Sequence, residues 1–424
     1  MIKIMKLAET GADDILTRDI NLETGVEAIV NDIIENVRQN GDAALLDYCE
    51  RFDGARPAQL EVTREEIDRA LESEDPAFLA TLRKAKENIH AFHSRQVRNN
   101  FVITQENGAI LGQKVTPIER VGIYVPGGTA RYPSSVLMNT IPAKIAGVSE
   151  IVMVTPPDRD GNVPSAILAA AGIAGVDRIF KLGGAQAVAA LALGTESVPK
   201  VDKIVGPGNV FVATAKRKLY GLVDIDMSAG PSEILVLADG GCNPVYVAAD
   251  LLSQAEHDKL ATAVLITDSE TLALAVRDEL ERQIPELPRQ EIARASIDDN
   301  GKIILVDNMR EAVEVSNRIA PEHLEVCVDD PFALLGLIQN AGSIFLGKNV
   351  PESLGDYLAG PNHTLPTSGT ARFSSPLSVD DFVKKSSFLY YTGEALEEVK
   401  DDVVRFAKRE GLDAHARAVS KRFE

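Results

Sequence analysis

The histidines are the residues of this chain best suited to chemistry, and four of the six lie in its last two-fifths. These four are His257, His323, His363 and His415. Gln254 stands three positions before His257 in a stretch, 243–257, that is typical of a helix, so both side chains should share one face. With Asp356 and His415 they would offer two imidazoles, one carboxylate and one amide oxygen, which suits a divalent metal such as zinc.

Ordinary structural roles compete with this metal site. A single histidine on a helix is more often a hydrogen-bonded polar residue than a ligand, and glutamine is an uncommon ligand. His415 lies near the end of the chain, where a surface position is usual. Asp356 favours the metal site because it lies in a glycine-containing, irregular stretch. Residue chemistry alone leaves both interpretations open and favours the structural one.

Glu322 and His323 are adjacent and come at the start of an expected strand. Histidine titrates near neutral pH and can take a proton from an alcohol, and a neighbouring glutamate could activate water. The competing interpretation is a polar pair that merely begins a strand.

Three loops that contain glycine follow expected strands and lead toward helices: Val125-Pro-Gly-Gly-Thr129, Leu182-Gly-Gly-Ala-Gln186 and Gly206-Pro-Gly-Asn209. Glycine lets backbone N–H groups approach an anionic ligand at a helix N-terminus. Each loop alone could be a tight turn, but the carboxyl ends of strands in one parallel sheet converge on a crevice. The sequence has no Gly-x-Gly-x-x-Gly motif, so the dinucleotide fingerprint is incomplete.

Two further features favour structural roles. His90 and His93 are three residues apart among charged residues, and we expect a surface pair. Cys242 lies in the turn Asp239-Gly-Gly-Cys242, where a thiol could attack an aldehyde. Nothing near it indicates the lowered pKa that a reactive thiolate needs, so this role is disfavoured.

Composition limits the class of protein. A chain of 424 residues with 45% hydrophobic content should form at least two units. Its net charge of −19 argues against nucleic acid and against an anionic membrane surface as partners. Three scattered cysteines fit a reducing, cytoplasmic setting, and the first residues lack the apolar run of a signal peptide or membrane span.

Apolar spacing predicts an α/β protein. Helices are expected over 25–40 and 75–98, and 101–104 with 109–112 should form a hairpin. Beyond residue 119 short apolar strands alternate with helices, as in parallel sheets built from βαβ units. The strands are expected at 121–125, 150–154, 178–181, 203–205, 233–237, 263–267, 302–306, 324–328 and 343–346. They should form two doubly wound sheets with a seam near 229–232, followed by a charged helical tail over 396–423 that packs elsewhere in the assembly.

Longer motifs resemble those of the histidinol dehydrogenase family, in family order and over essentially the whole chain. They include Ile123-Tyr-Val-Pro-Gly-Gly-Thr129, Val201-Asp-Lys-Ile-Val-Gly-Pro-Gly-Asn209, Asp226-Met-Ser-Ala-Gly-Pro-Ser-Glu233, Asp250-Leu-Leu-Ser-Gln-Ala-Glu-His257, Ala320-Pro-Glu-His323, Glu352-Ser-Leu-Gly-Asp-Tyr357, Gly360-Pro-Asn-His-Thr-Leu-Pro-Thr-Ser-Gly369 and Glu410-Gly-Leu-Asp-Ala-His415. Several long motifs in order are more specific than any one of them.

The resemblance implies the oxidation of L-histidinol to L-histidine by two molecules of NAD, the last step of histidine biosynthesis. It implies one zinc ion per subunit, with Gln254, His257, Asp356 and His415 as ligands. His323 would be the catalytic base for the alcohol, and Glu322 the catalytic base that activates water. Substrate contacts are implied for Ser232, Gln254, His257, His323, Asp356, Glu410 and His415, and NAD contacts for Tyr124, Gln186 and Asn209.

The resemblance also implies two Rossmann-like, doubly wound domains in a homodimer that exchanges segments, so that Glu410 and His415 reach the partner's active site. We expect an N-terminal arm over 1–20, a first α/β domain over 21–125 and 232–377, a second over 126–231, and a C-terminal helical segment over 378–424. The alternatives are a dehydrogenase of the same family for another hydroxy compound, a zinc hydrolase, and a ligand-binding protein without catalysis.

Overall fold

The computed structural model describes residues 1–10, 25–127, 131–227 and 230–424. Their contacts divide them into two units, Met1–Gln96 with Ile118–Phe382, and Val97–Pro117 with Val383–Glu424. The first unit contains two parallel sheets and the second contains one antiparallel sheet. The expected seam near 229–232 does separate the two parallel sheets, although residues 228–229 lie outside the described ranges.

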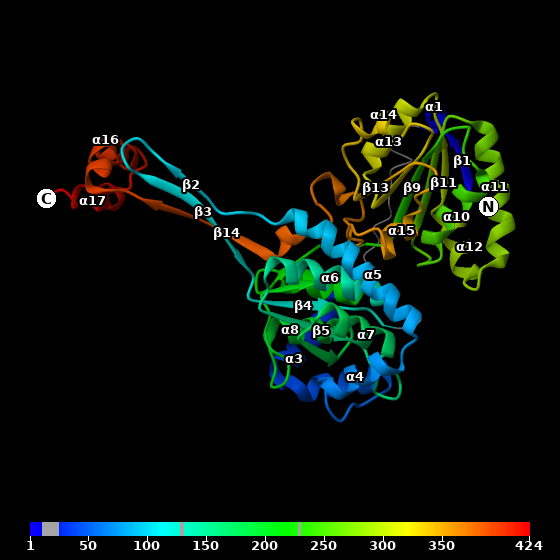
Figure 1. The fold of residues 1–424 in the computed structure, drawn as a ribbon, viewed down its shortest axis with the longest axis horizontal. Coiled ribbons are helices and arrows are strands. Elements are labelled where there is room, and N and C mark those ends of the chain that lie inside the picture. Colours follow the sequence, from blue (N-terminus) through cyan, green and yellow to red (C-terminus); the bar gives the residue numbers. More distant parts are fainter. Residues whose placement is uncertain (11–24, 128–130, 228–229) are drawn as a thin grey trace. The chain divides into compact units, whose positions relative to one another are not determined.

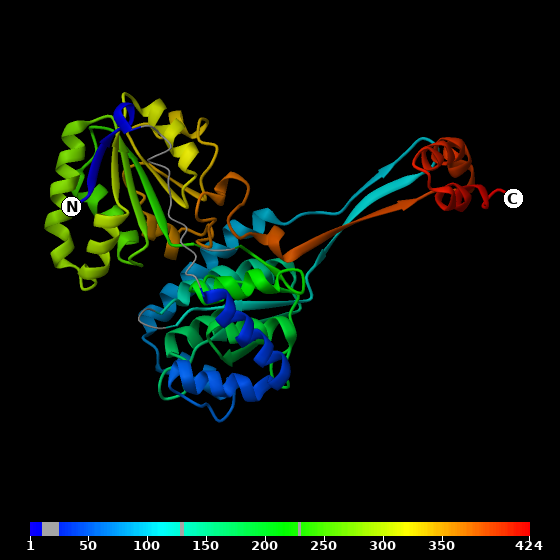
Figure 2. The same cartoon turned by 180° about the vertical axis from the view of Figure 1, so that it is seen from behind.

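A six-stranded parallel sheet, with strand order β1-β11-β10-β9-β12-β13, carries the candidate site (Figures 1 and 2). Alternate residues of β9 point to opposite faces: Ile234 packs with α10, α11 and α12, whereas Leu235 packs with α13. The strands are β1 (Lys3–Lys6), β9 (Glu233–Ala238), β10 (Thr262–Thr267), β11 (Lys302–Leu305), β12 (His323–Cys327) and β13 (Ser343–Leu346). The helices are α1 (Leu7–Thr10), α10 (Pro244–Ala255), α11 (Glu270–Gln283), α12 (Gln290–Asp299), α13 (Met309–Ile319), α14 (Phe332–Leu335) and α15 (Glu352–Tyr357).

A five-stranded parallel sheet, with order β6-β5-β4-β7-β8, forms the other part of this unit. Helices α3, α8 and α9 bury one face, and α4 to α7 bury the other. The strands are β4 (Arg120–Tyr124), β5 (Glu150–Thr155), β6 (Arg178–Lys181), β7 (Lys203–Val205) and β8 (Asp224–Ile225). The helices are α3 (Val26–Tyr48), α4 (Arg64–Ser73), α5 (Pro76–His93), α6 (Pro133–Ala146), α7 (Ser165–Ala174), α8 (Gly184–Leu193) and α9 (Val210–Leu219).

The nine predicted strands are confirmed, each end lying within one residue of its expected place. The predicted domain grouping differs from the structure, because helices α3 and α4 pack with helices of the 131–225 segment, and residues 97–117 belong to the second unit. Helix α3 packs on α8 and α9, and α4 packs on α7. Strand β4 is central in the five-stranded sheet, so a boundary at 125/126 would divide that sheet. The described part of the expected arm, 1–10, supplies β1, an edge strand paired with β11.

The second unit is an antiparallel sheet of order β14-β3-β2 with two helices. The predicted hairpin is confirmed as β2 (Phe101–Thr104) and β3 (Ile110–Pro117), but β14 (Val383–Tyr390) was not predicted. Nearly every residue of β14 is exposed, so this strand lacks the burial alternation that reveals strands in a sequence. The helical tail is two helices, α16 (Gly393–Arg409) and α17 (Asp413–Ser420), because Gly411 between them has a φ of +73°.

Among the helices that the structure describes, none has the length and apolar character needed to cross a membrane.

Candidate functional site

The site is built at the amino ends of β9 and β12, which are neighbours in the six-stranded sheet. His323 is the first residue of β12, and its Nδ1 lies 2.9 Å from the carbonyl oxygen of Glu233. A carbonyl can only accept, so Nδ1 carries the proton and donates it, and the lone pair of the neutral ring lies on Nε2. Glu322 precedes the strand, and its Oε2 accepts a hydrogen bond of 2.8 Å from the backbone N–H of Glu233. The two side chains are therefore oriented by one residue of the adjacent strand.

Helix α15 places two carboxylates near the free nitrogen of His323. Oε1 of Glu352 and Oδ1 of Asp356 each lie 3.8 Å from Nε2 of His323. Ligand atoms of these three residues lie within 4.8 Å of one another, so the group could itself hold a metal ion. Nε2 of His323 and Oε1 of Glu352 are buried without a hydrogen-bond partner among the described residues. Burying a polar atom without a hydrogen-bond partner costs free energy unless a bound ligand supplies that partner.

The pKa values of this cluster are strongly shifted. Burial raises the pKa of Glu322 to about 7 and that of Glu352 to about 8. Burial works in the same direction on Asp356, but His323 and His363 outweigh it and hold the Asp356 pKa at about 2. For His323 burial would lower the pKa, and the charges of Glu322, Asp356 and Glu352 raise it to about 10. Burial and the charges around the His323 imidazole therefore together set the pKa values of this cluster.

A cavity of about 130 Å³ opens beside this cluster and is lined by His323, Asp356 and His363, with apolar walls that include Phe345 and Leu365. His363 follows α15, and its Nδ1 lies 3.1 Å from the carbonyl oxygen of Asp356. Its Nε2 lies 3.2 Å from the hydroxyl of Ser135, a residue of α6 in the five-stranded part. This hydrogen bond links the candidate site to helix α6, which packs on the five-stranded sheet of the same unit.

The expected zinc ligands lie partly together. Gln254 is in the last turn of α10, and both atoms of its amide are buried without a hydrogen-bond partner in the described chain. His257 follows the end of this helix, in a turn where its N–H donates to the carbonyl of Gln254 at 3.0 Å. Asp356 and His323 are close enough to His257 for their charges to act on its pKa. The amide oxygen of Gln254 is therefore available to a ligand.

The remaining predicted substrate and zinc residues are divided between the two units. Ser232 is half-buried directly before β9, and its carbonyl accepts a hydrogen bond of 3.0 Å from the N–H of Thr262. Glu410 and His415 belong to the second unit, at the end of α16 and on α17, and both are exposed.

The expected NAD residues lie at the carboxyl edge of the five-stranded sheet. From β4 the sheet continues through β5 and β6 on one side and through β7 and β8 on the other. The direction in which successive strands are added therefore reverses at the boundary between β4 and β7. Ligands of open α/β sheets bind at such a reversal. Tyr124 ends β4, and Asn209 after β7 caps α9 by accepting hydrogen bonds from the N–H groups of Phe211 and Val212. Gln186 is in the first turn of α8, and its Oε1 is buried without a partner among the described residues.

The glycine loops at this edge are tightly packed. A Cβ on Gly206, whose φ is +106°, would lie 2.2 Å from the carbonyl oxygen of Tyr124. A Cβ on Gly183 would lie 2.6 Å from Pro156, and the Tyr124 hydroxyl accepts a hydrogen bond of 3.0 Å from the N–H of Gly184. The loop at 125–129 is described only as far as residue 127. A side chain larger than that of glycine would therefore clash at both Gly183 and Gly206.

A buried ion pair fixes the loop at 206–209. Lys216 of α9 pairs with Asp226, and Nζ of Lys216 also donates to the carbonyl oxygen of Gly206 at 3.0 Å. The second oxygen of Asp226 accepts a hydrogen bond of 2.7 Å from the N–H of Gly206. Both side chains are almost fully buried.

Replacing Lys216 with methionine is expected to lower the free energy of unfolding by about 3–5 kcal/mol, because Asp226 would stay buried without its cation. The matched control is Lys218→Met on the same helix, which removes an exposed pair with Glu27 and should cost less than about 1 kcal/mol. Chemical unfolding monitored by circular dichroism measures both. Equal losses in the two variants would show that the buried pair has no special role.

A buried glutamate, Glu325, and the half-buried Asp250 lie next to the start of α15. Oε1 of Glu325 accepts a hydrogen bond of 2.7 Å from the N–H of Glu352 at the start of this helix. Burial raises the pKa of Glu325 to about 9, and it also raises the pKa of Asp250, whose side chain is hydrogen-bonded to Glu325. The raised pKa of Glu325 favours its protonated form, which can donate to Asp250.

Sequence reasoning missed three residues of the site and misplaced one histidine. Glu233, Glu352 and His363 contact Glu322 and His323 or their neighbours, and each lies inside or beside a motif that already carried a predicted residue. His93 was expected on the surface but is fully buried, with Nδ1 2.7 Å from Oε1 of Gln96, whereas His90 is exposed. His93 lies four residues after buried Ile89, which places it on the inner face of α5.

Residues 16–423 match the histidinol dehydrogenase family. The chain belongs to that family. A histidinol dehydrogenase of Clostridium acetobutylicum is 58% identical over 392 residues, which cover 92% of this chain and 91% of that protein. One of Listeria monocytogenes serovar 1/2a is 58% identical over 399 residues, covering 94% and 93% of the two chains. The crystal structure of histidinol dehydrogenase from Elizabethkingia anophelis superposes with a TM-score of 0.95 at 38% identity, covering 100% of this chain and 98% of that one. The parallel-sheet α/β fold described above is therefore a histidinol dehydrogenase fold.

Proposed function

We propose that this protein oxidises L-histidinol to L-histidine through L-histidinaldehyde, with two molecules of NAD, as the last step of histidine biosynthesis. The observation that carries the proposal is the paired orientation of Glu322 and His323 by Glu233, beside a cavity, in a chain of this family. NAD, when bound, accepts the hydride that leaves the carbon being oxidised.

His323 is the proposed base for the alcohol and again for the hydrated aldehyde. The proton bound to Nδ1 keeps the Nε2 lone pair available to take a proton from a hydroxyl group in the cavity. The imidazole of His323 must be neutral before it can accept a proton, whereas the surrounding carboxylates raise the His323 pKa to about 10. A cation bound at Asp356 would offset part of that negative charge and lower the pKa toward the working range.

Glu322 is the proposed base that takes a proton from the water that hydrates the aldehyde. Its pKa of about 7 lets the carboxylate and the acid coexist near neutral pH. Its Oε2 is engaged by the N–H of Glu233, which leaves Oε1 to face water. Enclosure of the aldehyde between the two steps limits its release.

Zinc, one ion per subunit, would orient the substrate when bound. Gln254, His257 and Asp356 of one subunit with His415 of the partner subunit are the proposed ligands. The unpartnered amide of Gln254 and the low pKa of Asp356 support this set, because a metal ligand must be unprotonated and unengaged. Ser232, His323 and Glu410 would complete the contacts with substrate.

Tyr124, Gln186 and Asn209 are the proposed contacts of NAD, at the strand reversal between β4 and β7. The tight glycine loops and the N-terminus of α9 suit a pyrophosphate.

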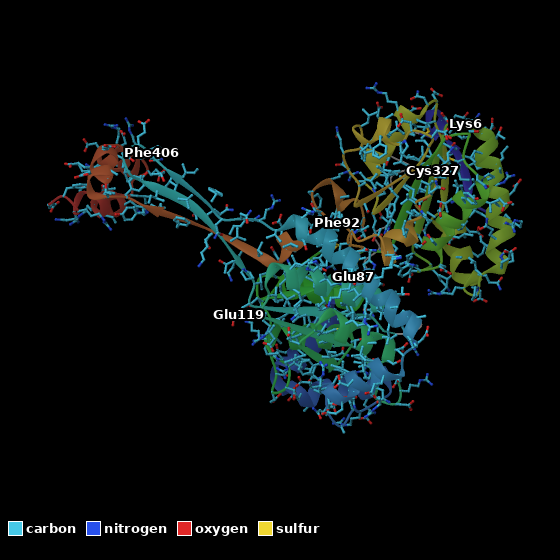
Figure 3. The ribbon with its side chains drawn as sticks, viewed as in Figure 1. Lys6, Glu87, Phe92, Glu119, Cys327 and Phe406 are labelled. Carbon is cyan, nitrogen blue, oxygen red and sulfur yellow. The ribbon has the colours of Figure 1, made fainter. Side chains whose placement is uncertain are left out.

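A homodimer would let the second unit supply Glu410 and His415 to its partner. Large apolar side chains are exposed on this unit, among them Phe101, Ile103, Leu389 and Phe406, of which Figure 3 labels the last. Exposed apolar residues in such number are typical of an interface.

The yield of NADH from a limiting amount of L-histidinol tests the proposed function. We expect two molecules of NADH for each molecule of histidinol consumed, read as absorbance with excess NAD. A yield of one would indicate a simple alcohol dehydrogenase. A zinc hydrolase or a ligand-binding protein would give none, and would contradict the proposal.

A further inference from the structure

Two of the three cysteines meet at the carboxyl ends of β9 and β12, the end opposite to Glu322 and His323. Cys327 is the last residue of β12, labelled in Figure 3, and is paired in register with Ala238, the last residue of β9. Cys242 lies four residues beyond Ala238, in the turn that leads into α10. The adjacent strands therefore hold the two thiols together although 85 residues separate them along the chain.

The thiols are in direct contact. Sγ of Cys242 lies 3.3 Å from Sγ of Cys327, and it also donates a hydrogen bond to the carbonyl oxygen of Cys327. A disulfide needs a sulfur separation of about 2 Å, so a shift of little more than 1 Å would form one. Both residues are buried, but Gly240 and Gly241, next to Cys242, are exposed, so Cys242 lies close to the surface.

The turn around Cys242 is held in place by several polar contacts. The N–H of Cys242 donates to the carbonyl of Asp239 at 3.1 Å, and Nζ of Lys348 donates to the carbonyl of Gly241 at 3.1 Å. The hydrogen bond between the two thiols, together with the charge of Lys348, outweighs burial and Asp239 and lowers the pKa of the Cys242 thiol, whereas the pKa of the Cys327 thiol is raised. Cys242 is thus the better nucleophile of the two.

We propose that Cys242 and Cys327 form a reversible intrachain disulfide when the protein meets hydrogen peroxide. This site is separate from the proposed catalytic site, and it does not depend on the substrate or on zinc.

The chemistry needs one peroxide and no other reactant. The thiolate of Cys242 attacks one peroxide oxygen, the O–O bond breaks, and the departing hydroxide takes up a proton to become water. The product is a sulfenic acid on Cys242. Sγ of Cys327 then attacks that sulfur, the S–S bond forms, and the S–O bond breaks with loss of a second water. The two thiols lose two electrons, which reduce the peroxide to two molecules of water.

Cys49 provides an internal control. It is fully buried on the five-stranded side, its Sγ donates to the carbonyl of Lys181 at 3.5 Å, and burial raises its pKa to about 12. It should therefore remain a thiol.

The test is a thiol count on the full-length protein after exposure to hydrogen peroxide. Free thiols are alkylated with iodoacetamide in denaturant, and the peptides are identified by mass spectrometry. We expect the alkylated cysteines to fall from three to one, with Cys49 alone modified, and a cross-linked peptide that joins 242 to 327. Dithiothreitol should restore all three.

Two single variants complete the test. Cys242→Ser should give no cross-link and leave Cys327 free to be alkylated, whereas the matched variant Cys49→Ser should form the cross-link as the unmodified chain does. The proposal is wrong if all three thiols survive peroxide that fully oxidises free dithiothreitol. It is equally wrong if Cys242 becomes a sulfinic acid while Cys327 stays free, or if the bond joins two chains on a non-reducing gel.

Discussion

Replacing His323 with alanine is expected to lower the turnover of L-histidinol by about a thousandfold or more, because general base catalysis contributes roughly 10²–10⁴ to rates. Both oxidation steps should fall together, since the same nitrogen is the proposed base in each. The measurement is the steady-state rate of NADH formation with each of L-histidinol and L-histidinaldehyde as substrate.

The control for this variant is His93→Ala, which removes another buried imidazole far along the chain from the site. The two variants can be compared directly because each change deletes a buried imidazole ring. His93→Ala should retain turnover. Zinc content should stay near one per subunit in His323→Ala, since His323 is not a proposed ligand. Turnover within about tenfold of the unmodified chain would remove His323 from the role of base.

Replacing Glu322 with glutamine is expected to slow oxidation of the aldehyde by about a hundredfold or more, and oxidation of the alcohol much less. Glutamine keeps the oxygen that accepts from the N–H of Glu233, so the geometry at the start of β12 should survive. Only the ability to take a proton from water is lost.

A rapid-mixing experiment separates the two steps. The variant should release about one NADH per site quickly and the second slowly, as the aldehyde waits for water. Glu325→Gln is the matched control, because Glu325 lies on β12, three residues after Glu322, but accepts a hydrogen bond from α15 rather than from Glu233. Equal slowing of both steps in Glu322→Gln would exclude the water-activating role.

The sequence predicted the sheets well because apolar strands in parallel sheets are short, continuous and buried on both faces. Ile234 and Leu235 lie on opposite faces of β9, and both are apolar because both faces are buried. The resulting continuous apolar run allowed β9 to be predicted. The packing of α3 on the five-stranded sheet was missed because an amphipathic helix shows which face is apolar but not which sheet covers it. Strand β14 was missed for the opposite reason, since its residues are almost all exposed.

The site was harder to predict than the fold. The glycine loops lie at the carboxyl ends of strands, where ligands of open α/β sheets usually bind, but Glu322 and His323 lie at the amino end of β12. Helix spacing placed Gln254 correctly, whereas His257 lies in the turn after α10. The role of Glu233 rests on its backbone, which holds His323 and Glu322 through groups that every residue possesses. No pattern of residue types can reveal such a contact.

The most direct test of the proposed active site is the position of zinc in a crystal of the zinc-loaded dimer, located by anomalous scattering at the zinc edge. We predict that the ion is bound by Gln254, His257 and Asp356 of one subunit and by His415 of the partner subunit. The structure offers a rival set, His323, Glu352 and Asp356, within a single subunit. Zinc bound by that set would occupy the proposed base and would contradict the account.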